Sequence, residues 1–239
     1  MEKLLFTGAS GFLGHNVKPI LEKQYEITSI GITDQDNIKV NIAKDIPFLP
    51  EKYDVVLHAA GRAHVYPKSQ DEIKAFYDVN YEGTVNLCKA LEKGGLPKSF
   101  IFISTLDVYG LAVGLNINED SPKNPSSHYA ISKLQAEEFL IKWAEEKGVI
   151  LGILRPSLMI GPNPPGNLKS MINGIKKGYY VNIAGGKTRK SLMMIYDIAN
   201  LVPKIENVGG IYNVCDNRHP SYEAVSYTHL RAHETEADL

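Results

Sequence analysis

The sequence predicts an α/β protein built on a doubly wound parallel sheet, followed by a smaller, truncated C-terminal part. Short, almost continuously apolar segments alternate with segments of helical periodicity, which is typical of buried parallel strands joined by crossover helices. The first apolar segment also runs directly into a glycine-rich turn and the start of a helix, all within Met1–Gly14. These two observations carry the fold prediction.

The first strand, expected over Lys3–Thr7, leads into a loop with glycines at intervals of three residues. Gly8 permits the tight turn, Gly11 permits a close approach of the backbone, and Gly14 permits tight packing on the sheet of the helix expected over Phe12–Lys23. A helix N-terminus exposes unpaired N–H groups, so a loop without side chains lets a pyrophosphate bind there. By itself, the spacing fits a purely structural turn as well.

The composition argues against several classes of partner. The 239 residues are 44% hydrophobic and 22% charged, with a formal net charge of −1 and no run of Lys or Arg, so we expect neither nucleic acid nor a membrane as a partner. No apolar run approaches the roughly 20 residues of a membrane span. Cys88 and Cys215 have no zinc-ligand spacing, so we expect no metal site and a reducing cytoplasmic location.

The octapeptide TGASGFLG, Thr7–Gly14, resembles the cofactor loop of the extended short-chain dehydrogenase/reductase family. That family comprises nucleotide-sugar epimerases, dehydratases and reductases with a Rossmann domain and a nicotinamide cofactor. The resemblance implies that Ser10, Phe12 and Leu13 bind the cofactor together with the three glycines. It also implies a nucleotide-sugar substrate. Members often dimerise through a helix pair, which makes a homodimer an expectation.

The second strand, expected over Glu26–Ile32, is followed by acidic residues that bear on the choice of cofactor. Asp34 stands 20 residues after Gly14, where an NAD-binding fold often places a carboxylate that accepts hydrogen bonds from the ribose and repels a 2′-phosphate. No arginine stands near this strand end, so we expect NAD rather than NADP. An equally good interpretation is that Asp34 is only a solvated residue of the turn, because aspartate is common in turns. We expect no long helix before the third strand, Asp54–His58.

The third strand ends in three small residues, Ala59, Ala60 and Gly61, at an edge where parallel sheets bind ligands. These residues would admit the cofactor ribose. Arg62 and His64 follow on the same loop, which resembles that of bacterial polysaccharide enzymes in the family. Either side chain would face the substrate, although a plain surface role remains open.

A long helical pattern over Glu72–Lys93 contains VNYEGT, which resembles the family's V-N-x-x-G-T and implies a cofactor-binding Asn80 near the active site. The alternative is a buried polar side chain that only satisfies its own hydrogen bonds. After the fourth strand, Ser99–Ser104, the resemblance makes Thr105 the catalytic hydroxyl and Asp107 a substrate contact.

The helix expected over Pro125–Glu146 carries Tyr129 and Lys133 four residues apart, and therefore on one face. A tyrosine and a lysine four residues apart are expected about once by chance in a chain of this composition. The pair is informative because it follows the glycine loop and the strand before Thr105 in the order that the family shows. A phenol has a pKa of about 10, so a general base requires neighbouring positive charge. We expect the ammonium and an oxidised nicotinamide to lower the Tyr129 pKa. Tyr129 and Lys133 are thus both catalytic and cofactor-binding in this prediction.

A further strand, expected over Val149–Arg155, ends in RPSLMIGP, which resembles a family motif whose backbone after Pro156 lines the cofactor pocket. Later segments resemble those that hold the substrate diphosphate, which implies contacts from Asn167 and from Arg189 or Lys190. Solvated loop cations are the alternative for the last two.

We expect a cofactor-binding domain over 1–160 and a partial substrate-binding region over 161–224, some of whose segments return to the main sheet. Ser221 is a fair helix N-cap. Residues 225–239 form an expected non-native tail, because Val225–Thr235 resembles a translated sequencing adapter. The tail histidines would then have no function.

These patterns favour an NAD-dependent 4-epimerase that acts on a UDP-sugar, with Tyr129 as the base. A 4-keto-sugar-nucleotide reductase would use the same residues. A 4,6-dehydratase is disfavoured, because Leu106 stands where that branch has an acidic residue. A non-catalytic dinucleotide-sensing module is the remaining alternative, and the Tyr129–Lys133 pair argues against it.

Overall fold

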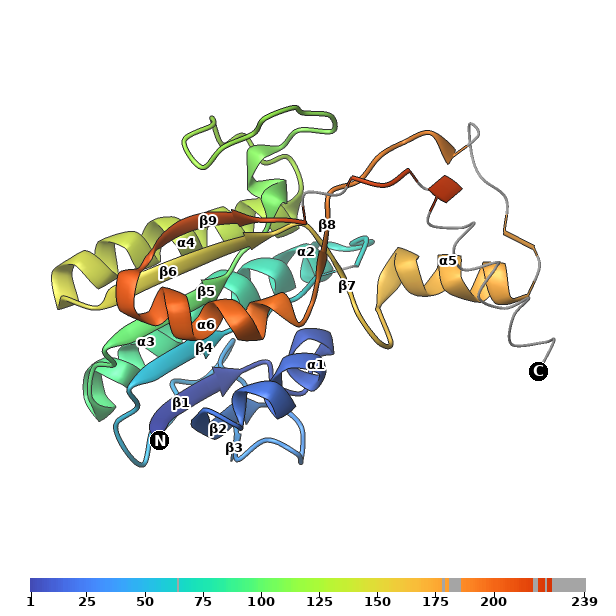
Figure 1. The fold of residues 1–239 in the computed structure, drawn as a ribbon. Helices are drawn as coiled ribbons and strands as arrows, with labels where there is room; N and C mark the ends of the chain where they lie inside the picture. Colours follow the sequence, from blue (N-terminus) through green and yellow to red (C-terminus); the bar gives the residue numbers. More distant parts are fainter. Residues whose placement is uncertain (64, 178, 181–185, 217–218, 222, 225–239) are drawn as a thin grey trace.

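The computed structural model describes residues 1–239 except 64, 178, 181–185, 217, 218, 222 and 225–239. Its centre is a seven-stranded parallel sheet in the order β3-β2-β1-β4-β5-β6-β9, which confirms the predicted fold class (Figure 1). The strands are β1 Glu2–Thr7, β2 Tyr25–Gly31, β3 Ile38–Lys39, β4 Val55–His58, β5 Ser99–Ile103, β6 Ile150–Pro156 and β9 Gly210–Val214.

Helices cover both faces of this sheet, in the doubly wound arrangement (Figure 1). On one face α1 (Phe12–Leu21) and α6 (Asp197–Val208) pack on inward residues such as Leu4 and Phe6. On the other face α3 (Gly83–Gly94) and α4 (His128–Lys147) pack on Leu5 and its neighbours. Because successive side chains of a strand point to opposite faces, each central strand contributes to both cores.

The connectivity places a ligand site at one edge of the sheet. β1 pairs with β2 on one side and with β4 on the other, so the direction of winding reverses next to β1. In such sheets ligands bind outside the carboxyl ends of the strands at this reversal. The glycine loop, the residues after β4 and the residues after β5 all lie at these ends.

Two helices differ from the sequence expectation. The segment expected as one helix over Glu72–Lys93 consists of α2 (Gln70–Tyr77), a π-helical turn η1 (Asp78–Glu82), and α3. The π turn inserts an extra residue, which is typical of functional sites, and it contains the fully buried Asn80. The helix expected from Pro125 begins instead at His128, because the Ser127 hydroxyl accepts a hydrogen bond from the Ala130 N–H and caps it.

The chain after residue 156 alternates between a peripheral part and the main sheet. β7 (Leu158–Ile160) and β8 (Leu192–Met194) form a parallel pair, and α5 (Gly166–Lys176) lies beyond the strand ends (Figure 1). α6 and β9 then return to the sheet. In the part of the chain that the structure describes, no helix is long and apolar enough to cross a membrane.

Candidate active site

The glycine loop is closely packed at the points where the sequence has no side chain. Gly8 has φ +78°, and a Cβ there would lie 2.7 Å from the Ala60 nitrogen. A Cβ on Gly14 would lie 2.2 Å from the Ala9 carbonyl oxygen, and one on Gly11 would lie 3.2 Å from the Gly8 oxygen. The first two contacts are with backbone, so a side chain at either position would displace the loop or α1.

The N-terminus of α1 is open to an anion. Gly11 is its N-cap, so no side chain caps the helix, and the first turn has no acidic residue. Its first N–H groups and helix dipole therefore suit a pyrophosphate. Phe12 and Leu13 lie in this turn, and Ser10 directly precedes the N-cap. A pocket beside it is lined by Ala9, Ser10, His15, Lys18, Pro19, Ser29, Gln35 and Asp36. The glycine cradle, the uncapped helix and Lys18 together fit a dinucleotide.

Asp36, rather than Asp34, is the acidic residue that lines the pocket beside α1. The Asp34 side chain is 92% exposed and pairs with Lys39, 2.5 Å from its ammonium nitrogen. Asp36 is buried, lines the pocket and accepts hydrogen bonds from the N–H and hydroxyl of Thr33. The absence of a side chain on Gly31 leaves room for it, because a Cβ there would lie 2.3 Å from Asp36 Oδ2. Asp36 was missed because two acids, Asp34 and Asp36, compete in one short turn.

The small residues after β4 connect the glycine loop to the lysine of the expected pair. The Ala60 N–H donates to the Thr7 hydroxyl, at 3.2 Å, and Ala59 and Ala60 contact Gly8. A Cβ on Gly61 would lie 3.3 Å from Lys133 Nζ and 3.2 Å from Asn80 Oδ1. The loop residues expected to admit the ribose therefore lie between the glycine loop and α4.

Asn80 and Arg62 organise the loop that follows. Asn80 Oδ1 accepts from the Arg62 N–H at 2.7 Å, and Asn80 Nδ2 donates to the Ser132 hydroxyl at 2.9 Å. The Arg62 guanidinium lies 5.7 Å from the centre of the Phe76 ring, which is 6.5 Å from the Tyr129 ring. Arg62 Nε is buried and has no hydrogen-bond partner among the described residues. His64 falls outside the described residues.

Thr105, Asp107 and Tyr129 form one cluster after β5. Thr105 caps the short 3-10 helix η2 (Leu106–Tyr109) by accepting from the Asp107 N–H at 3.1 Å. Burial and the negative charge of Asp107 raise the pKa of Tyr129 to about 12, against a hydrogen bond with Thr105 that lowers this pKa. The prediction that the Tyr129 pKa is lowered is therefore wrong for the protein without cofactor. In that state the charge of Lys133 does not offset the effect of burial on the phenol.

Lys133 is buried on the same face of α4, one turn after Tyr129. Its ammonium donates to the Ile103 carbonyl at 2.7 Å and lies 4.4 Å from the centre of the Phe102 ring. Burial lowers the pKa of Lys133 to about 7, although the charge of Glu137 raises it. The amine is thus held at the carboxyl end of β5, close to Gly61.

His58 stands beneath this cluster, and the sequence pattern did not single it out. It ends β4, is fully buried, and its Nδ1 lies 2.6 Å from the Thr7 hydroxyl while its Nε2 lies 2.8 Å from the Thr84 hydroxyl. Burial, assisted by the charge of Lys133, lowers the pKa of His58 to about 3. A neutral imidazole therefore links β1, β4 and α3.

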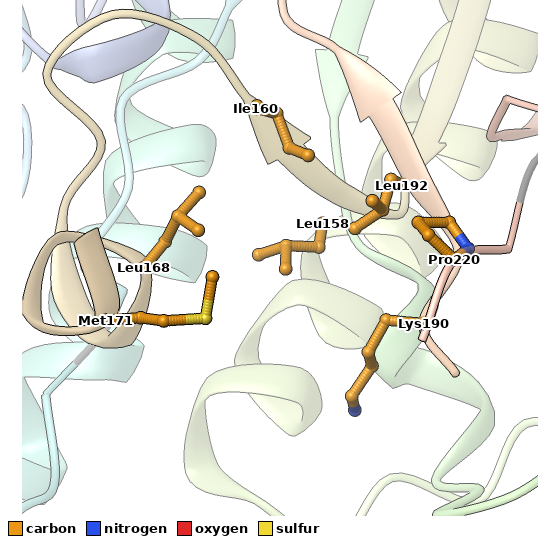
Figure 2. A pocket seen from close by; sticks show the side chains of 7 residues that line it. All are labelled: Leu158, Ile160, Leu168, Met171, Lys190, Leu192 and Pro220. Carbon is orange, nitrogen blue, oxygen red and sulfur yellow. The ribbon is translucent and has the colours of Figure 1, made fainter. Parts of the chain in front are cut away.

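The remaining expected substrate contacts lie apart from this cluster. Asn167 is exposed in the first turn of α5, and Pro156 ends β6 at the active edge of the sheet. Lys190 borders a small apolar pocket between α5 and the β7–β8 pair, as Figure 2 shows, together with Leu158, Ile160, Leu168, Met171, Leu192 and Pro220. Arg189 is exposed and donates to the His219 carbonyl at 3.2 Å. Among the described residues, no hydrogen bond joins Asn167, Arg189 or Lys190 to Tyr129. Nor does any group of three metal-ligating side chains occur in the described ranges.

Comparison with known proteins shows which enzymes this chain is similar to. One relative is 33% identical over 89% of this chain and 66% of its own length. It is the N-acetyl-alpha-D-glucosaminyl-diphospho-ditrans,octacis-undecaprenol 4-epimerase of Escherichia coli O157:H7. UDP-glucose 4-epimerase of Vibrio cholerae is 30% identical over 84% of this chain and 65% of its own. GDP-6-deoxy-D-mannose reductase of Pseudomonas aeruginosa is 27% identical over 91% of this chain and 75% of its own length. The chain thus spans about two thirds of the length of the first two relatives.

A solved structure, that of RMD from Pseudomonas aeruginosa complexed with NADPH, superposes with a TM-score of 0.81 at 25% identity. The match covers 95% of this chain and 82% of that one. The model of the family described as "NAD dependent epimerase/dehydratase family" matches residues 4–215. The resemblance found in the sequence is therefore confirmed: the chain belongs to the NAD-dependent epimerase/dehydratase family.

Proposed function

We propose that this chain is the cofactor-binding and catalytic part of an NAD-dependent nucleotide-sugar 4-epimerase that acts on a UDP-sugar. The observation that carries the proposal is the convergence of Thr105, Tyr129 and Lys133 at the sheet edge that also holds the glycine loop. The 4-epimerases of Escherichia coli and Vibrio cholerae among the relatives support this choice of reaction.

In this proposal the bound nicotinamide supplies the hydride acceptor, and the protein supplies position and proton transfer. Tyr129 Oη takes the proton from the C4 hydroxyl of the sugar, and the Thr105 hydroxyl orients that oxygen. Lys133 follows Tyr129 by one turn on the same face of α4, and its ammonium lies near the loop at Gly61, where a ribose would bind. With a pKa of about 12, Tyr129 stays protonated at neutral pH. Its work as a base therefore requires positive charge beside it when substrate is bound.

Arg62 is the best-supported substrate contact of the proposed set. Its Nε is buried without a partner among the described residues, beside the rings of Phe76 and Tyr129. An unpaired buried donor is costly, and an oxygen of the substrate would satisfy it. Asp107 is exposed, and its charge acts on Tyr129. Asn167, Arg189 and Lys190 would act further out, on the diphosphate.

The acidic turn after β2 supports NAD rather than NADP. Asp36 lines the pocket beside α1, and Asp34 adds a second carboxylate nearby. Both would repel a 2′-phosphate, and Asp36 is placed better to accept from a ribose hydroxyl. Lys39 argues against this preference for NAD, because its positive charge lies at the same strand end and pairs with Asp34.

A 4-keto-sugar-nucleotide reductase is the second candidate, favoured by the Pseudomonas aeruginosa reductase among the relatives and by the NADPH in the superposed structure. It would use Tyr129 as an acid rather than as a base. The two candidates differ in whether reduced cofactor is consumed.

The test begins with titration of this chain with NAD and with NADP by calorimetry, where we expect tighter binding of NAD. UDP-sugars, and separately 4-keto-sugar nucleotides with added NADH or NADPH, are then assayed with this chain and with a form extended by the C-terminal part of the Vibrio cholerae epimerase. Epimerisation without added cofactor supports the first candidate, and stoichiometric consumption of NADH or NADPH supports the second. If neither dinucleotide binds, both candidates fail, and so does the sensing module.

A further inference from the structure

A buried ion pair lies on the Tyr129–Lys133 face of α4, one turn after Lys133. The side chains of Glu137 and Arg155 are each 1% exposed. Arg155 Nε donates to Glu137 Oε1 at 3.1 Å, and Nη2 donates to Oε2 at 2.6 Å. The Ser104 hydroxyl also donates to Glu137. Because a buried pair of this kind adds little net stability over apolar residues of equal volume, its location beside the site is the informative feature.

Glu137 continues the row of functional side chains along the helix. Tyr129, Lys133 and Glu137 follow one another at intervals of four residues and therefore share a face. Glu137 from α4 and His58 from β4 interact electrostatically with Lys133, Arg155 from β6 bonds to Glu137, and Asp107 from η2 acts on Tyr129. Within this set, the carboxylate of Glu137 is the charge that raises the Lys133 pKa against burial.

Arg155 connects the same pair to the turn that carries Thr105 and Asp107. Its Nη1 donates to the Tyr109 hydroxyl at 2.7 Å, and its guanidinium lies 5.2 Å from the centre of the Tyr109 ring. Tyr109 is the last residue of η2, and its hydroxyl donates to Asn213 Oδ1 of β9 at 2.8 Å. One guanidinium thus bonds to α4 on one side and to η2 on the other.

We propose that Glu137 and Arg155 are positioning residues of the candidate active site. Glu137 supplies the negative charge that keeps Lys133 an ammonium, and Arg155 holds η2, with Thr105 and Asp107, against Tyr129. The role in turnover rests on the proposed function. The charge relation between Glu137 and Lys133 belongs to the chain's own residues and can be measured without turnover.

The first experiment follows folding stability against pH by urea unfolding of the whole chain, read by Trp143 fluorescence. Glu137→Gln alone leaves Arg155 unpaired and buried, so the main variant is Glu137→Gln with Arg155→Met, which removes both charges at similar volume. Glu138→Gln, at the exposed neighbouring position of α4, is the matched control.

The unfolded lysine binds its proton below pH 10.5, and the folded one binds it only below about pH 7. As the pH is lowered from 10.5 to about 7, the proton binds to the unfolded chain but not to the folded one. The folding constant of the native chain therefore decreases about tenfold per pH unit because of Lys133, and below about pH 7 this decrease stops. In the double variant the fall continues, with up to about tenfold further loss between pH 7 and 6. Adding Lys133→Met removes this extra loss. A double variant whose pH curve runs parallel to that of the native chain overturns the proposal.

The second experiment measures turnover by the extended form. The double variant should lose tenfold or more in kcat at pH 7 with KM within twofold, and the acid limb of kcat should move to higher pH. A loss confined to KM, or one equal at every pH, indicates a merely structural pair and overturns the positioning role. If the native form shows no turnover, the proposed function fails, while the stability curves still decide whether Glu137 holds the charge on Lys133.

Discussion

At the scale of single residues, the proposed chemistry depends on the hydroxyl of Tyr129. We expect Tyr129→Phe to lower kcat by roughly 10²-fold to 10⁴-fold, the usual contribution of a positioned acid or base. The ring would keep its contact with Phe76, so NAD affinity and stability should change little. Steady-state assays of the extended form and calorimetric NAD titration of the chain measure the two effects.

Ser132→Ala is an unsuitable control for that experiment, because its hydroxyl receives the bond from Asn80. Tyr179→Phe, at an exposed tyrosine, is a better one and should leave kcat unchanged. Turnover of Tyr129→Phe within tenfold of the native rate would contradict the assignment of the base.

His58 should make the fold sensitive to acid. Its folded pKa of about 3 lies below the ordinary value of 6.5, so the unfolded chain binds the proton first. Its contribution to stability is complete above pH 6.5 and is lost as the pH falls toward 3. From pH 7 to 5 this contribution should fall by about 2 kcal/mol.

Urea unfolding at pH 7 and pH 5 measures that loss, and His58→Gln provides the comparison. The amide can still bond to Thr7 or Thr84 and has no proton to gain in this range. We expect the variant to be less stable at pH 7 and less dependent on pH. An equal dependence on pH in both chains would show that another group titrates.

At the scale of elements, the close packing of α1 on the glycine loop can be tested by one methyl group. Gly14→Ala would place a Cβ 2.2 Å from the Ala9 carbonyl oxygen, so helix and loop must separate. We expect a loss of about 1–3 kcal/mol in stability, as for other overpacked sites, and at least tenfold weaker NAD binding. Urea unfolding and calorimetry measure the two quantities.

Gly148→Ala, after the last turn of α4, is the matched control. Gly148 has φ +66°, and nothing lies within 4 Å of the place that a Cβ would take, so the substitution costs only backbone strain of about 1 kcal/mol. NAD affinity should be unchanged. Equal losses of affinity in the two variants would mean that the contact at Gly14 does not shape the cofactor site.

Most strands could be predicted from the sequence, but one helical feature could not. The apolar runs bounded by polar or glycine residues gave β1, β4, β5 and β6 to within about one residue of the observed ends. The π turn over Asp78–Glu82 was hidden, because the apolar residues on either side keep a nearly helical spacing. Its cause is tertiary: Asn80 reaches the Arg62 loop and Ser132, and no local pattern records those partners.

The site was predictable where the chemistry is local to a motif and was missed where it depends on distant partners. Tyr129 and Lys133 follow from spacing and order along the chain. Glu137, four residues after Lys133, looks in the sequence like a solvated acid of a helix face. What distinguishes it is burial against Arg155 on another element, together with its place between Ala136 and Leu140 in the pattern of buried positions. That apolar setting was the available signal.

At the scale of the whole molecule, the expected boundary at residue 160 does not separate two packing units. Ile198, Val202 and Ile205 of α6 are buried in the same core as α1 and the sheet. β9 pairs with β6 along residues 210–214, and Asn213 bonds to Tyr109 beside the site. α6 and β9 therefore complete the layers of the central sheet, while α5 and the β7–β8 pair lie outside it.

We therefore expect a chain ending at residue 160 not to fold, and one ending at residue 224 to fold and bind NAD. Without α6, burial of at least three large apolar side chains is lost, at about 1.5–3 kcal/mol each, which is comparable to the whole stability of a typical domain. The β6 edge would also lose its partner strand. Circular dichroism, urea unfolding and calorimetric NAD titration of the two chains decide the matter. A cooperative unfolding transition in the 160-residue chain would place the boundary where the sequence suggested, and loss of NAD binding in the 224-residue chain would give residues 225–239 a role.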